Sequence, residues 1–428
     1  MTIIRLARWF SSVRRTNFIL LLVMSLAAWS ARAQLPQVQV PGVQVPGVPG
    51  LPDARRAVGG TLRELSAARA LRAERLLREH RAELDRDPRG ELVVRAEVVA
   101  IDITPVALEK ALAAHFVVLR TEELADLAFK ITVLQTPDGM SASRGLKRLR
   151  KLDPEGTYDF NHVYLDSGET DGDFPRVAPR AAQTVETVGG AGGLRRIGLI
   201  DGGVDVAHQA FKPLRLHHFG CGGRQVPSAH GTAVASILTG NRTFGDLYMA
   251  DVYCGEAAGG AVDAVAAAFG WMARERVAVV NVSLVGPRNA LLERAVRALA
   301  ARGHLIVAAV GNDGPASPPL YPAAYQDVVG VTGIDGRHRV LIEACRGGHV
   351  DFAAPGADVS AAAQAPDQYV SVRGTSFAAP QVAALLGDLQ SPDIPARDQL
   401  LDRLAAGARD LGKPGRDDVY GAGEPRTL

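Results

Sequence analysis

The chain has 428 residues, of which 47% are hydrophobic and 22% are charged, and this composition is typical of a globular protein with two or three domains and a large core. A formal net charge of +2 on this length gives no support for nucleic-acid binding, and the sequence carries no nucleic-acid-binding motif.

Residues 1–33 have the three parts of an export signal. Four arginines precede a short apolar run at residues 18–29, and Ala31 and Ala33 then supply the small residues that a signal peptidase recognises. A membrane anchor is the alternative, but the run is shorter than the roughly 20 residues that a spanning helix needs. We therefore expect an exported protein, periplasmic or extracellular, with no membrane span after signal removal. The Arg- and Ala-rich composition favours a bacterial source.

Residues 34–88 are predicted to lie outside the folded domains. Residues 34–52 form a small Val-Pro-Gly repeat with nothing to bury, which predicts an extended tether. Residues 55–87 are rich in arginine and carry spaced leucines, which predicts an amphipathic helix with one face resting on the protein. A membrane-surface helix is the less favoured alternative, because acidic residues are mixed through the segment.

Residues 89–165 are predicted to form a small α+β domain. Strand-like and helix-like segments alternate in the order β-α-β-β-α-β, which is the ferredoxin-like pattern. Thr104 and Pro105 are suited to the cap and first turn of the first helix. Residues 166–193 have the composition of a linker, with acidic residues, prolines and the run GGAGG, and are expected to be exposed to proteases.

Residues 194–428 change to short buried strands separated by alanine-rich helices. This alternation predicts an α/β domain with a mostly parallel sheet covered by helices on both faces. In such a sheet, functional groups gather beyond the carboxyl ends of the strands.

Three short motifs of this domain carry candidate catalytic side chains. Asp201 ends a buried strand in IGLIDGG, His230 opens a small-residue helix in SAHGT, and Ser376 begins a helix in RGTSFAAP. Each alone is ordinary, since aspartate caps turns, histidine starts helices and serine is a common N-cap. Together, a carboxylate can orient an imidazole, and the imidazole can take the proton of a serine hydroxyl.

The order Asp, His, Ser resembles that of the subtilisin-like serine proteases, the subtilases. Their His-Gly-Thr motif is intact at His230, and their Gly-Thr-Ser-x-Ala-x-Pro motif is intact around Ser376. At Gly202 the chain has glycine where the family has serine or threonine, a change expected to tune activity while leaving the Asp201 carboxylate in place. The resemblance covers about residues 195–423 and implies a serine endopeptidase that works through an acyl-enzyme.

The resemblance also implies an oxyanion site and a substrate-binding strand. Asn312, in VAAVGND, is expected to donate its amide to the oxyanion, together with the backbone N–H of Ser376. The stretch from Ser283 through Leu284 and Val285 to Gly286 is similar to the family's strand that pairs with substrate and forms a wall of the S1 pocket. The family commonly has glycine where Val285 stands, so specificity is not transferred. Asp313 is expected near the pocket floor, where it would favour basic residues.

By resemblance, residues 89–165 are expected to be a propeptide that acts as an intramolecular inhibitor and is released by self-cleavage within residues 166–193. Other partners would be protein or peptide substrates. Two alternatives stay open: a non-catalytic binding protein on the subtilase fold, and a peptide ligase or cyclase that uses the same acyl-enzyme. No cofactor is expected to be required, and calcium binding stays open, since no EF-hand-like loop is present.

Three cysteines leave at least one unpaired within the chain. Cys221 and Cys254 are the expected disulfide, because both flank the His230 region, although sequence alone does not fix the pairing. His217 and His218 with Cys221 resemble a metal cluster, but no further ligand motif is visible, and loop histidines are the favoured interpretation. No metal-site residue is therefore predicted.

Overall fold

The computed structural model describes residues 69–167, 176–177, 195–240, 244–389 and 397–426. The predicted export signal, the Val-Pro-Gly tether and most of the predicted linker lie outside these residues. Among the described residues, no helix combines the length and the apolar character that crossing a membrane requires.

The N-terminal α+β region, residues 84–166, contains the element order predicted from its sequence. Its elements are β1 (Leu84–Arg86), β2 (Leu92–Ile101), α2 (Pro105–Ala113), β3 (Val117–Leu124), β4 (Phe129–Gln135), α3 (Ala142–Leu152), β5 (Thr157–His162) and β6 (Leu165–Asp166). In the antiparallel sheet, β2 lies between β4 and β5, and β3 pairs with β4. The Thr104 side chain caps α2 by accepting the N–H of Ala107 at 3.2 Å, as its position predicted.

The prediction of a helix over residues 55–87 is wrong for the last residues of this range. A helix is present at residues 69–79, but residues 84–86 form strand β1, which pairs antiparallel with β2. Leu84 is fully buried there, among Leu92, Val94 and Leu165. Burial of this leucine in a sheet overrides the helical periodicity of the segment.

The C-terminal domain is built on a seven-stranded parallel sheet in the order β15-β14-β13-β11-β8-β10-β9. Its strands are β8 (Arg195–Asp201), β9 (Arg215–Phe219), β10 (Phe244–Asp251), β11 (Val279–Val282), β13 (Leu305–Ala309), β14 (Val328–Ile334) and β15 (Phe352–Pro355). The predicted parallel α/β fold is confirmed.

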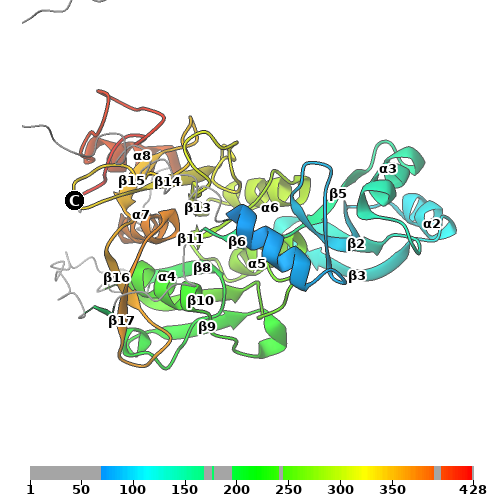
Figure 1. Ribbon diagram of the computed structural model, residues 1–428, viewed down its shortest axis with the longest axis horizontal. Helices are drawn as coiled ribbons and strands as arrows, with labels where there is room; N and C mark the ends of the chain where they lie inside the picture. The colour runs from blue at the N-terminus through cyan, green and yellow to red at the C-terminus, as the bar shows by residue number, and fades with distance from the viewer. Residues whose placement is uncertain (1–68, 168–175, 178–194, 241–243, 390–396, 427–428) are drawn as a thin grey trace, which may run out of the picture. The chain divides into compact units, whose positions relative to one another are not determined.

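Helices cover both faces of this sheet. Helices α4 (Ala229–Thr239), α7 (Thr375–Leu389) and α8 (Arg397–Ala406) pack on one hydrophobic core, which includes Leu199. Helices α5 (Val262–Arg274) and α6 (Ala290–Ala300) pack on the other, which includes Ile200. Residues of β3 and β4 join that second core, so α5 and α6 lie between the parallel sheet and the N-terminal α+β region (Figure 1).

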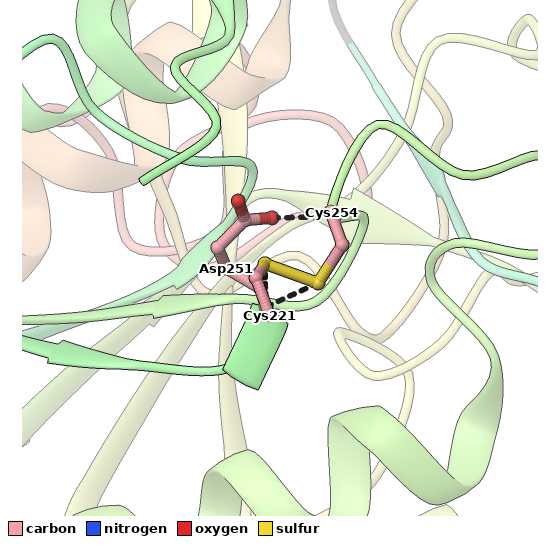
Figure 2. A group of neighbouring side chains, drawn as sticks. All are labelled: Cys221, Asp251 and Cys254. Atoms are coloured by element: carbon pink, nitrogen blue, oxygen red, sulfur yellow. Dashed lines mark hydrogen bonds between the residues drawn. A yellow bond between two sulfur atoms is a disulfide. The ribbon is translucent and has the colours of Figure 1, made fainter. Parts of the chain in front are cut away.

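A disulfide joins the ends of two neighbouring strands. Cys221 and Cys254 are bonded, with their Cα atoms 5.2 Å apart, as expected from the sequence. Figure 2 shows Asp251 beside them, where its carboxylate accepts the backbone N–H of Cys254 at 2.9 Å. Although two sulfurs and a carboxylate cluster here, both sulfurs are bonded to each other, so neither is a thiolate ligand and Cys221 does not join the histidine pair. Cys345 is a buried free cysteine.

Candidate active site

The parallel sheet gathers the candidate catalytic side chains at the carboxyl ends of its strands. Asp201 is the last residue of β8, and His230 is the second residue of α4, whose N-cap is Ser228. Ser376 is the second residue of α7, and Asn312 follows β13. Residues that are far apart in sequence thus meet at one edge of the sheet, as parallel topology requires.

Asp201 and His230 form a buried pair. The Nδ1 atom of His230 lies 2.9 Å from Oδ1 of Asp201, and the side chains are 3% and 1% exposed. Burial lowers the pKa of His230, but the negative charges of Asp201 and Asp166 and the hydrogen bond with Asp201 more than offset this, so the pKa of His230 is raised. The carboxylate therefore holds the ring orientation and stabilises its charged form.

Ser376 is fully buried, and its hydroxyl is engaged away from the imidazole. Its Oγ donates to the carbonyl oxygen of Ser283 at 3.3 Å and is hydrogen-bonded to the Ser167 hydroxyl. The Nε2 atom of His230 is buried and has no hydrogen-bond partner among the described residues. The imidazole packs against Phe377, the residue after Ser376, with ring centroids 5.4 Å apart. The structure thus makes the Asp201–His230 contact but no hydrogen bond between His230 and Ser376.

The Asn312 side chain is held by its amide oxygen. This oxygen accepts the backbone N–H of Thr375 at 3.2 Å, and the Thr375 hydroxyl accepts the N–H of Gly311 at 3.2 Å. The Asn312 amide nitrogen donates to the carbonyl oxygen of Ser167. Thr375 therefore orients the amide toward the Ser167 carbonyl, a role not recognised from the sequence.

The predicted substrate-binding strand pairs with a strand of the chain's own N-terminal α+β region. In an antiparallel ladder, Leu284 lies opposite Asp166 and Val285 opposite Leu165. The N–H of Ser167 donates to the carbonyl oxygen of Ser283 at 3.4 Å. We call residues 164–167 the cleft strand, because they lie along Ser283–Gly286 and end beside Ser376.

Tyr164 fixes the other end of the cleft strand. It is fully buried, its N–H donates to the carbonyl oxygen of Gly260 at 2.8 Å, and its hydroxyl donates to that of Pro287 at 2.6 Å. A Cβ atom on Gly286 would lie 2.6 Å from the Tyr164 ring, so glycine at that position allows the ring to pack. The cleft strand is thus anchored on two sides.

Sequence reasoning missed Ser167 and two arginines of the helix at residues 69–79. Ser167 carries no motif of its own, and its place depends on the docking of one folded region on another. The arginines left a weak signal, since Arg69 and Arg72 share a helix face with Ala73 and Leu76. Asp313, expected to bind basic substrate residues, binds Arg69 of that helix, with Nε 2.6 Å from Oδ2.

Comparison with known proteins identifies the C-terminal domain. Residues 196–423 match the model of the Peptidase_S8, or subtilase, family. The chain is 32% identical over 207 residues to the minor extracellular protease Epr of Bacillus subtilis (strain 168), covering 46% of this chain and 32% of that protein. It is 33% identical over 207 residues to subtilisin BL of Lederbergia lenta, covering 46% of this chain and 75% of that protein. The chain thus spans about a third of the length of the first of these relatives.

Among solved structures, fervidolysin from Fervidobacterium pennivorans has the same fold, with a TM-score of 0.62 at 18% identity over 78% of this chain and 60% of that one. The family match takes in more than half of the chain and contains all three motifs that carried the resemblance. The chain belongs to the subtilase family of serine peptidases.

Proposed function

We propose that the chain is an exported serine endopeptidase, made as a precursor that cuts itself after Ser167. One observation carries the proposal: the carbonyl oxygen of Ser167 accepts the Asn312 amide beside the buried Ser376. A peptide carbonyl next to a serine hydroxyl and polarised by an amide donor is arranged as the substrate of acyl transfer. Residue 167 also falls within the linker in which the sequence predicts the cut.

The reaction needs the Ser376 hydroxyl to turn from Ser283 toward His230. Nε2 of His230 takes the hydroxyl proton as Oγ bonds to the Ser167 carbonyl carbon, and Asn312 stabilises the negative charge on the carbonyl oxygen. The bond to the next nitrogen then breaks, and this nitrogen takes the proton from His230. Water then attacks the resulting ester and gives a proton to His230. His230 passes this proton to Oγ of Ser376 as the ester bond breaks, which restores the serine hydroxyl. Asp201 orients the ring and stabilises its charge throughout.

Export is supported by the three-part N-terminal signal and by the printed description of a relative as an extracellular protease. Released from the N-terminal region, the cleft along Ser283–Gly286 would accept other extended peptides by the same antiparallel pairing.

The cut is tested by the mass of the fragment that the purified precursor releases. We expect an N-terminal fragment whose last residue is Ser167, because that carbonyl oxygen accepts a hydrogen bond from the Asn312 amide. Intact-mass measurement of both fragments and sequencing of the mature N-terminus locate the bond. A precursor that is processed at a different residue, or is never cut while it hydrolyses other substrates, would contradict self-cleavage at this position.

The pH dependence of self-cleavage follows from the raised pKa of His230. The neutral ring is the base, so we expect the rate to fall as the pH drops through a midpoint above the ordinary value of 6.5. Asp166 contributes to that rise, whereas the positive charge of Arg72 opposes it. The change Asp166→Asn should therefore move the midpoint to lower pH. The measurement is the single-turnover rate of precursor cutting between about pH 4 and 9, a range that extends roughly two units to either side of the ordinary pKa of histidine.

The matched control for this pH profile is Asp398→Asn, which removes an exposed carboxylate from α8. Its midpoint should equal that of the unaltered precursor. A midpoint that moves upward in Asp166→Asn would show that Asp166 does not stabilise the charged imidazole.

A further inference from the structure

The helix at residues 69–79, which we call the strap, rests on both regions of the protein. Ala73 is buried, and Leu76 and Leu77 pack on a cluster that includes Leu165 of the cleft strand and Ala261, which precedes α5. Figure 1 shows this helix, in blue, beside β6. The apolar side chains of the strap therefore pack against both the N-terminal α+β region and the C-terminal domain.

Two arginines of the strap lie on this same face. Residues 69, 72, 73 and 76 have the spacing i, i+3, i+4 and i+7, which places them along one side of a helix. Both side chains point toward the site and are less than one-third exposed, at 21% for Arg69 and 31% for Arg72. Their charges are therefore screened less by solvent than those of a surface pair.

Arg72 binds the cleft strand itself. Its Nη1 pairs with Oδ1 of Asp166, the residue immediately before Ser167. The Asp166 side chain is 10% exposed, so this ion pair is largely shielded. Loss of the arginine would leave a nearly buried carboxylate without this partner, which disfavours the seated strand.

Arg69 binds the residue next to Asn312. Its Nε lies 2.6 Å from Oδ2 of Asp313, the residue after Asn312, and its Nη1 lies 3.0 Å from Oε2 of Glu91. One guanidinium thus joins the rim of the oxyanion site to the start of the N-terminal α+β region. Charge-assisted contacts of this kind are the stronger hydrogen bonds in proteins.

We propose that the strap is a second inhibitory element, in which Arg69 and Arg72 retain the cleft strand in the active site after the bond following Ser167 is cut. The proposal rests on the proposed function. It makes the two arginines positioning residues, which act through Asp166 and Asp313 and not on the reacting atoms. Release of the N-terminal region then requires the Arg69–Asp313 ion pair to break in addition to the ladder with Leu284 and Val285. The Arg72–Asp166 pair lies within the released fragment, where it holds Asp166 in its seated position opposite Leu284.

The test follows cutting and activation separately in the full-length precursor. Mass spectrometry measures the cut after Ser167, and hydrolysis of an unrelated peptide reports a free cleft. We expect a lag between the two events in the unaltered protein. The double change Arg69→Ala/Arg72→Ala should shorten that lag about tenfold or more, the scale expected when charge-assisted contacts are lost. The N-terminal fragment should also cease to co-elute with the mature domain in gel filtration.

The matched control is Arg78→Ala, which removes an exposed arginine from the same helix and should leave the lag unchanged. The charge-reversed pair Arg72→Asp/Asp166→Arg should restore retention relative to Arg72→Asp alone, a result that general damage to folding would not give. A lag and co-elution in the double variant equal to those of Arg78→Ala would overturn the inference. Absence of any cut after Ser167 in the unaltered precursor would instead refute the proposed function.

Discussion

Replacing the proposed nucleophile, Ser376→Ala, is expected to stop both self-cleavage and peptide hydrolysis. The alanine has no Oγ to bond to the Ser167 carbonyl, so no acyl-enzyme forms. Loss of this group costs roughly 10⁶-fold in turnover in subtilisin, and we expect the same order here. The measurement is the time course of precursor cutting by intact mass, together with hydrolysis of casein. Uncut precursor should accumulate.

The variant should keep its fold, because among the described residues the Ser376 hydroxyl makes hydrogen bonds only with Ser283 and Ser167. Ser360→Ala is the matched control, since it removes a buried hydroxyl of β16 (Val359–Ala362) that lacks a partner among the described residues. This control should cut at the unaltered rate. Normal processing of Ser376→Ala, with the cut inside one molecule, would reject Ser376 as the nucleophile.

The second large effect is expected for Asn312→Ala, which removes the proposed side-chain donor to the oxyanion. The rate of self-cleavage should fall by about 10²–10³, the loss known for the corresponding donor in subtilisin. Because the cleft strand already lies in the site, substrate binding does not contribute to the single-turnover rate, and this rate measures the chemical step alone. Stopped reactions analysed by intact mass give this rate.

Asn312 also accepts the N–H of Thr375, so its removal alters more than the donor. Asn312→Asp separates the two roles, because aspartate keeps an acceptor for Thr375 but places a negative charge at the oxyanion. It should cut at least as slowly as Asn312→Ala. Gln326→Ala removes an amide from an exposed residue and should have no effect. A loss of less than about fivefold in both Asn312 variants would exclude this residue as a major donor.

Much of the fold and of the candidate site was predictable because local patterns agreed with one another. Short buried strands alternating with alanine-rich helices predict a parallel sheet, and parallel strands bring their carboxyl ends to one edge. Asp201 and Asn312 follow strands, whereas His230 and Ser376 begin helices, so all four were expected to meet at that edge. The motifs around Asp201, His230 and Ser376, in that order along the chain, indicated the chemistry.

The disulfide shows where sequence reasoning needed tertiary structure. Three cysteines allow several pairings, but β9 and β10 lie side by side with Phe219 opposite Ala250. Cys221 and Cys254 follow these strand ends and are therefore brought together. Cys345 instead lies buried behind Gly311, 3.0 Å from the hydroxyl of Ser317. The register between β9 and β10 determines which cysteines meet, and this register cannot be predicted from the spacing of the cysteines in the sequence.

The place of Ser167 was not predictable for a related reason. Its carbonyl reaches Asn312 because Leu165 and Asp166 pair with Leu284 and Val285, which depends on how the N-terminal α+β region packs on the C-terminal domain. The contacts of the strap arginines could not be predicted from the sequence for the same reason. Composition predicted a helix resting on the protein, but only the packed structure relates its charges to Asp166 and Asp313.

The proposed self-cleavage implies different kinetics for the first cut and for all later ones. In the proposed first cut, the substrate is covalently part of the same molecule and already paired along Ser283–Gly286, so this cut would be a first-order event that dilution leaves unchanged. Every later substrate must reach the same groove by diffusion, at a rate proportional to its concentration. A dilute precursor outside the cell would thus mature at the same rate as a concentrated one, while its activity on other proteins would scale with their abundance.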